Sequence, residues 1–173
     1  DWQVEPAAKT DITKDGTIDL NVKVTDITHK YAVDLVYSLQ DLVIDGAITW
    51  NVNTMKYEVG GNKLEDTTRK VKVYNRSDLP VYAYATITNT DDADGITVTA
   101  ENDSATNKLT IAKATAGVGA SNGTSTVEEL VINLKSTNWN AVAEYYAAKR
   151  LASANQATDT FRIATVTVTI TKD

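Results

Sequence analysis

Two features of this chain of 173 residues come closest to a catalytic or metal-binding pattern: its single histidine and one acidic turn. The chain contains no cysteine, which excludes thiolate metal sites and thiol nucleophiles, and a lone His29 cannot build a zinc site. His29 follows Asp26 in a short polar stretch between two expected strands, a pattern that favours a turn residue. Because the chain also lacks a phosphate-binding glycine loop and the G-x-S-x-G and H-E-x-x-H motifs, we expect that it is not an enzyme.

The acidic turn matches part of a calcium-binding loop. Counted from Thr90, Asp92 and Asp94 stand at positions three and five, Gly95 at six and Glu101 at twelve, as in an EF-hand. Position one is a threonine rather than an aspartate, however, and the flanking segments alternate as strands where an EF-hand has helices. The spacing therefore predicts a tight, solvated β-hairpin turn, with Asp92 and Asp94 as a weak candidate site for Ca²⁺ and no other metal or cofactor.

Aromatic residues form a second candidate site. Tyr82 and Tyr84 lie at alternate positions of an expected strand, and Trp139 opens an expected helix. Exposed aromatic rings stack on the apolar faces of sugars, whereas tyrosines at alternate strand positions more often pack at the margin of a core with their hydroxyl groups outward. The sequence leaves both interpretations open, and it makes these three residues candidate glycan contacts.

The composition predicts a globular protein that does not bind nucleic acid and has no transmembrane segment. The net charge of −6 and the isoelectric point near 4.8 indicate an acidic surface, which repels phosphate backbones. No apolar run approaches the roughly 20 residues of a transmembrane helix. The length favours one domain, large enough to bury a core without a metal or a disulfide.

Apolar and polar residues alternate with a period of two along most of the chain, which is typical of β-strands. A hairpin is expected from residues 48–50 and 55–59, and the last strand lies within residues 159–171. The other expected strands are Thr17–Asp26, Tyr31–Ser38, Leu39–Ile44, Lys70–Asn75, Val81–Thr90, Ile96–Ala100, Lys108–Lys113 and Val127–Lys135. The pattern predicts an all-β fold, an antiparallel β-sandwich of the Ig-like or jelly-roll type.

One segment, Trp139–Leu151, departs from this alternation. It is rich in the helix formers Ala, Glu, Lys and Arg, and Asn138 or Asn140 precedes or opens it as a candidate cap. Trp139, Val142 and Tyr146 are spaced by three and four residues, which places them on one face of a helix. We expect a short helical insertion, near residues 139–151, between the last two strands.

Four motifs occur in an order that resembles a group of secreted, largely uncharacterised β-sandwich surface proteins of Gram-positive bacteria. They are Tyr31-Ala32-Val33-Asp34-Leu35, Trp50 to Thr54 before Tyr57, Val71 to Ser77 with its V-x-N-x-S pattern, and the closing Ala164 to Ile170. Tyr37 stands where the group usually has tryptophan, and the helical segment is an insertion relative to the pattern. The resemblance implies an Ig-like sandwich outside the cell and carries over no catalytic residue.

The N-terminal segment suggests how the protein functions. Trp2 and Val4 alternate ahead of the first clear strand, so residues 1–13 are expected to form an extension and residues 14–173 a single sandwich domain. The first residue is Asp1 rather than methionine, which fits removal of a secretory leader and a secreted or cell-surface location. A strand-like extension either pairs with a neighbouring subunit by donor-strand complementation or packs on its own sandwich, and the sequence leaves both open.

The sequence therefore favours a structural, non-catalytic surface protein, a pilus-like filament subunit whose partner is a further copy of itself and whose assembly residues are Trp2 and Val4. Two alternatives remain. One is an adhesin-like β-sandwich module that binds carbohydrate or a host surface through Tyr82, Tyr84 or Trp139. The other is a virion decoration protein.

Overall fold

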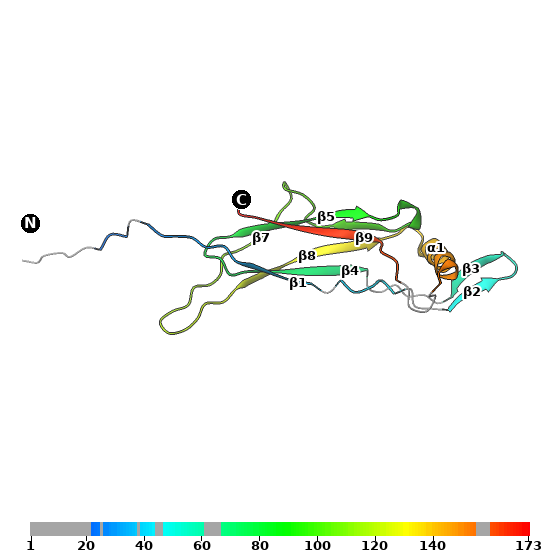
Figure 1. Ribbon diagram of the computed structural model, residues 1–173, viewed down its shortest axis with the longest axis horizontal. Helices are drawn as coiled ribbons and strands as arrows, with labels where there is room; N and C mark the ends of the chain where they lie inside the picture. The colour runs from blue at the N-terminus through cyan, green and yellow to red at the C-terminus, as the bar shows by residue number, and fades with distance from the viewer. Residues whose placement is uncertain (1–21, 25, 38, 44–46, 61–66, 155–159) are drawn as a thin grey trace, which may run out of the picture.

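The computed structural model describes residues 22–24, 26–37, 39–43, 47–60, 67–154 and 160–173 (Figure 1). This part of the chain is mostly β-strand, with one α-helix and one short 3₁₀ helix. The elements are β1 (Val33–Tyr37), β2 (Ala47–Asn51), β3 (Lys56–Gly60), β4 (Thr68–Asn75), β5 (Val81–Asn89), η1 (Asp92–Asp94), β6 (Thr97–Ala100), β7 (Leu109–Ile111), β8 (Thr126–Lys135), α1 (Trp139–Ala152) and β9 (Ala164–Thr171).

The strands form two main antiparallel sheets and one separate hairpin. One sheet has the order β1-β4-β8-β6, the other has the order β7-β5-β9, and β2 pairs only with β3 among the described residues. All pairings are antiparallel. The predicted all-β sandwich with one short helix is thus confirmed, and α1 and the β2–β3 hairpin lie together at one end of it (Figure 1).

The core lies between the two sheets and follows the period of two in the sequence. Along β5, for example, Val81, Ala83 and Ala85 are buried, while Tyr82 and Tyr84 between them are only half-buried. Each fully buried valine, leucine or isoleucine stabilises the fold by roughly 1.5–3 kcal/mol. The buried apolar residues from both sheets are Val71, Val73, Val81, Ala83, Ala85, Val98, Ile111, Leu130, Ile132 and Leu134.

One side of the sandwich is closed because the chain passes from one sheet to the other. After β6 in the first sheet, the Glu101 N–H donates to the Val131 carbonyl at 3.0 Å, and the Ala85 N–H donates to the Asn102 carbonyl at 2.9 Å. The chain then continues into β7 of the second sheet. Backbone hydrogen bonds therefore join the two sheets along this side.

At the opposite side, β1 and β9 are the outer strands of their sheets within the described residues. The Lys172 ammonium lies 4.5 Å from the centre of the Tyr31 ring, which places the end of β9 beside the segment that leads into β1. Within the part of the chain that the structure describes, β1 pairs only with β4, and β9 pairs only with β5. This side is consequently the one where strand edges are open.

A buried asparagine ties the two sheets together at the end of β4. The Asn75 side chain is completely buried, and its Nδ2 donates to the carbonyls of Leu79 at 3.0 Å, Ile111 at 3.3 Å and Ala112 at 2.9 Å. Its Oδ1 accepts from the Ser77 N–H at 2.8 Å. Asn75 thereby fixes the loop that follows β4 and the end of β7 in a single network.

Three details of the sequence-based fold are wrong. The described parts of Thr17–Asp26 and Leu39–Ile44 lie outside strands, because an alternating pattern makes a strand only where another strand pairs with it. The turn Asp91–Gly95 does not close a hairpin. β5 pairs with β7 and β9 while β6 pairs with β8, so the turn instead connects the two sheets.

The helix agrees with expectation. The Asn138 side chain, one of the two candidate caps, accepts from the Ala141 N–H at 3.2 Å at the first turn of α1. Val142, Ala143 and Ala147 form its buried face.

Replacing Asn75 by alanine should strongly destabilise the fold, because three carbonyls and one N–H lose their partner together. At about 1–3 kcal/mol for each buried group left unsatisfied, we expect a loss of at least about 3 kcal/mol in the free energy of unfolding. Chemical denaturation measures it. Asn140→Ala, at an exposed position of α1, is the matched control and should change stability by less than about 0.5 kcal/mol. Equal effects of the two substitutions would contradict the role given to Asn75.

Candidate functional site

An extended arm precedes the first strand and projects away from the sandwich at the end opposite α1 (Figure 1). Val22 is 90% exposed, Val24 70% and Ile27 67%. Single exposed apolar residues are normal, but here valines at alternate positions of an extended chain present an apolar face to solvent. The arm, defined by the described residues between 22 and 32, thus has the pattern of a strand without a partner strand among the described residues.

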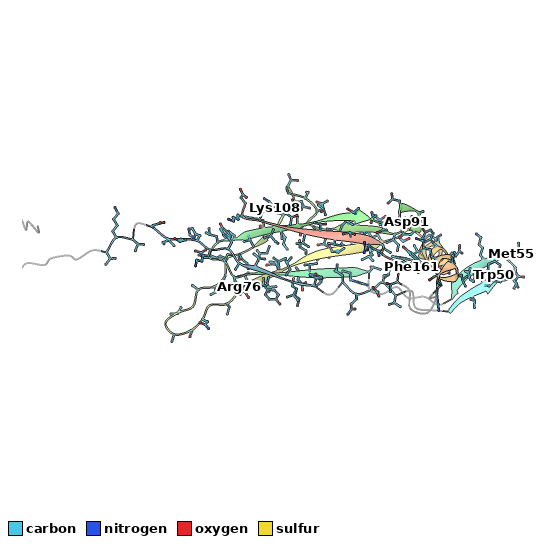
Figure 2. The ribbon with its side chains drawn as sticks, in the orientation of Figure 1. Trp50, Met55, Arg76, Asp91, Lys108 and Phe161 are labelled. Carbon is cyan, nitrogen blue, oxygen red and sulfur yellow. The ribbon has the colours of Figure 1, made fainter. Side chains whose placement is uncertain are left out.

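A groove lies at the other end of the molecule, where Figure 2 shows Phe161 beside α1. It is a cavity of about 570 Å³ between the segment 39–43, which follows β1, and the segment 160–166, which leads into β9. Core residues line it, namely Ile96, Val98, Ile132, Leu134 and Val166. The groove therefore gives access to the apolar interior from the open side of the sandwich.

The inner face of β9 is only partly covered. Val166, Val168 and Ile170 point inward but are half-buried, whereas Ala83 and Ala85, which pair with Ile170 and Val168, are completely buried. β9 lies at the outside of its sheet, so its inner side chains pack well on one side only. This incomplete burial continues the apolar surface of the groove along β9.

The rim of the groove, formed by the charged residues among its described lining, is rich in arginine: Arg69, Arg150 and Arg162 stand there with one acidic residue, Asp41. The Arg69 guanidinium donates to the carbonyls of Gln40 at 2.8 Å and Asp41 at 3.1 Å. These bonds hold the segment 39–43 as one wall of the groove without a strand ladder.

The helix is anchored beside the groove by a buried carboxylate. Asp94 is 2% exposed, and both of its oxygens accept hydrogen bonds, from the Ile96 N–H at 2.7 Å and from the Tyr146 hydroxyl at 2.5 Å. Burial, and after it the bond to Asp94, raises the pKa of the Tyr146 hydroxyl above its ordinary value. Tyr146 therefore stays protonated and acts as a donor that fastens α1 to the η1 turn.

A second, more exposed pair supports the same contact. The Tyr145 hydroxyl donates to Asp91, and the Lys149 ammonium lies 3.2 Å from the same carboxylate oxygen. The Tyr145 bond, followed by the Ala93 N–H and Lys149, lowers the pKa of Asp91. The bond with Tyr145, followed by the one with Asp91, raises the pKa of Lys149. The cluster thus attaches the side of α1 that carries Tyr145 and Lys149 to the start of η1.

The two aspartates predicted as a weak calcium site differ in environment. Asp92 is exposed on η1, while both oxygens of Asp94 are already engaged by protein donors. Among the described residues, no group of three or more His, Cys, Asp or Glu side chains is arranged to hold a metal ion. His29 contacts Asp78, with its Nδ1 2.7 Å from the carboxylate, and the His29 bond lowers the pKa of Asp78.

The candidate glycan contacts do not come together. Tyr82 and Tyr84 share the outer face of β5, opposite Thr171 and Thr169 of β9. Trp139 is the first residue of α1, which lies beyond the end of the sandwich where β9 begins, and its side chain packs half-buried against the core. The predicted assembly residues Trp2 and Val4 lie outside the described residues.

Sequence reasoning missed two exposed apolar features as site candidates. The alternation of Val22 and Val24 predicts a strand over Thr17–Asp26, and the same alternation marks the arm. Trp50, 51% exposed, meets Tyr57 edge to face at 5.0 Å on the β2–β3 hairpin, and Figure 2 places it with Met55 at the tip of the molecule. The hairpin was foreseen, but a side chain's exposure depends on what packs around it.

The two tyrosines of α1 should differ in importance. Tyr146→Phe removes the one side-chain donor that the described residues offer to the buried Asp94 carboxylate, and it should lower the free energy of unfolding by about 1–3 kcal/mol. Tyr145→Phe should cost less than about 1 kcal/mol, because Asp91 is partly exposed and water replaces the lost donor. Thermal and urea unfolding of both variants test this, and a larger loss for Tyr145→Phe would contradict it.

Stability should fall in acid, partly through Asp91. Its pKa is lower in the fold than the ordinary value of 3.8, so its contribution is complete above that value and is lost as pH falls through the folded pKa. Between about pH 6 and about pH 2 the melting temperature of the native protein should therefore drop more than that of Asp91→Asn. Asp92→Asn is the control and should follow the native protein. Parallel curves for all three proteins would exclude the role of Asp91.

No helix within the described residues is long and apolar enough to cross a membrane. Comparison of the chain with protein-family models, with curated proteins and with solved structures found no match.

Proposed function

We propose that this protein is a structural, non-catalytic subunit that assembles with copies of itself, head to tail, into a filament at the cell surface. The observation that carries the proposal is the arm, whose Val22 and Val24 alternate in an extended chain and are 90% and 70% exposed. An extended segment of this kind adds a strand to an open sheet edge, with main-chain hydrogen bonds giving affinity and alternate side chains filling pockets.

The positions of arm and groove favour a chain of subunits. The arm leaves at the end of the sandwich where β1 begins, and the groove lies at the end that carries α1 (Figure 1). The arm points away from its own sandwich, so the groove that it fits is that of another copy. A contact between two different surfaces of identical subunits does not close on itself and so builds an open filament.

The described part of the arm buries too little apolar surface to offset the free-energy cost of association by a wide margin. Burying Val22, Val24 and Ile27 contributes roughly 1.5–3 kcal/mol each, which together is comparable to the cost of association, about 4–15 kcal/mol. The sequence continues the alternation upstream with Ile18 and Leu20, and the extension with Trp2 and Val4 precedes them. The proposal therefore assigns the whole N-terminal segment to the interface. Its extracellular location is supported by the resemblance of four short motifs to secreted surface proteins.

Removing residues 1–27 should abolish assembly and leave a folded monomer, because the sandwich core contains no residue of the arm. The double variant Val22→Asp, Val24→Asp should do the same by placing charge on the apolar face. Val118→Asp, at a residue 82% exposed on another loop, is the matched control and should assemble normally. Negative-stain microscopy and light scattering report assembly, and thermal unfolding reports the fold. A shorter deletion of residues 1–13 isolates the contribution of Trp2 and Val4.

Filaments that persist after the deletion of residues 1–27 would refute the proposal. A native protein that stays monomeric at high concentration, with its N-terminal segment intact, would refute it equally.

A further inference from the structure

We infer that the arm of one copy pairs antiparallel with the free edge of β9 in the next copy, with Val22 and Val24 directed into the groove. This inference rests on the proposed function and identifies its acceptor. Self-assembly alone would fix neither the edge of β9, nor the antiparallel direction, nor the side chains beside Val22 and Val24.

β9 is the least protected edge of the described sandwich. Natural sheets guard their edges with short strands, charged residues, proline or a covering segment. β6 and β7 are short, with four and three residues, and the crossing between the sheets lies on their side. β1 carries Asp34, which pairs with Arg76 at 2.9 Å. β9 is eight residues long, ATVTVTIT, with neither charge nor proline.

Chain direction also distinguishes β9 from β1. A neighbour that approaches end to end inserts its arm from the α1 end, so that the N-terminal part of the arm lies deepest in the sandwich. β9 runs from the α1 end toward the arm end, whereas β1 runs the opposite way (Figure 1). The incoming arm is therefore antiparallel to β9 and parallel to β1, and antiparallel pairing is the slightly more stable of the two.

The side chains of the arm match the two faces of β9. With Val22 and Val24 facing the groove, they lie beside the half-buried row that contains Val166 and Val168, and Lys23 lies with the exposed threonines of the outer face. Charge fits as well. The rim has three arginines and one aspartate, a net +2, whereas residues 17–27 have two aspartates and one lysine, a net −1.

Cysteine pairs introduced into the full-length chain test the contact, since the native chain contains no cysteine. Val24→Cys is combined in one chain with Ala164→Cys, Val166→Cys, Val168→Cys or Ile170→Cys, and the assembled protein is oxidised. Because each subunit links to the next, the correct pair produces a covalent ladder on a non-reducing gel. We expect at least about tenfold more ladder from one of these pairs than from Val24→Cys with Val118→Cys, because a disulfide needs Cα atoms within about 7 Å.

Moving the cysteine from position 24 to position 22 of the arm tests the direction of the arm relative to β9. If the strands are antiparallel, Val22→Cys links two residues further along β9, toward its C-terminal end, than Val24→Cys does. A shift the other way would overturn the antiparallel arrangement. Lys23→Cys with Thr165→Cys or Thr167→Cys repeats the test at exposed positions, should a substitution on the inner face impair folding.

The possible failures are distinct. Filaments that form normally but give no ladder with any β9 position, or that give one with Leu35→Cys on the inner face of β1 instead, overturn the acceptor and leave the proposed function standing. Absence of assembly in the native protein overturns both.

Discussion

The Asn75 side chain is the interaction on which the rest of the structure depends. It joins the end of β4 to β7 of the other sheet, and it orders the loop that follows by accepting from the Ser77 N–H. That loop also fixes the root of the arm, because the Ser77 hydroxyl accepts from the Ala32 N–H at 2.9 Å and Asp78 contacts His29 at 2.7 Å. One buried amide thus holds the two sheets together and sets the point from which the arm departs.

The two ends of the sandwich are stabilised by different means. At the arm end, the hydrogen bonds from Asn75 to the carbonyls of Leu79 and Ala112 fix the chain. At the α1 end, the bond from Tyr146 to Asp94 fastens the helix over η1, and the space between the helix, the segment 39–43 and β9 is left as the groove. In the proposed filament, an arm with a fixed root and a groove that opens onto the core would form the two halves of one interface.

The sequence predicts most of the strands, the turns and the helix, but it does not predict which strands pair with each other. β5, β9 and α1 follow from their periods, and the Asn138 cap from its residue type. The sequence predicts a turn at Asp91–Gly95, and Gly95 has the positive φ of 77° that favours glycine. The strands on either side of the turn, β5 and β6, do not pair with each other, however, but belong to different sheets. The alternation at Val22 and Val24 correctly indicates an extended chain, yet a strand also needs a neighbour, and no local pattern says whether that neighbour belongs to the same molecule.

In the proposed filament, the arm and the β9 edge would explain each other. In an isolated subunit both are costly, since exposed valines order water and an uncharged, eight-residue edge invites non-specific pairing. The edge strand β1, by contrast, carries a charged residue of the kind that guards sheet edges, Asp34. If the valines of one copy cover the open face of the next, both costs disappear in a single contact. The absence of a guarding residue on β9 then becomes a requirement, because a lysine or proline there would exclude the incoming strand.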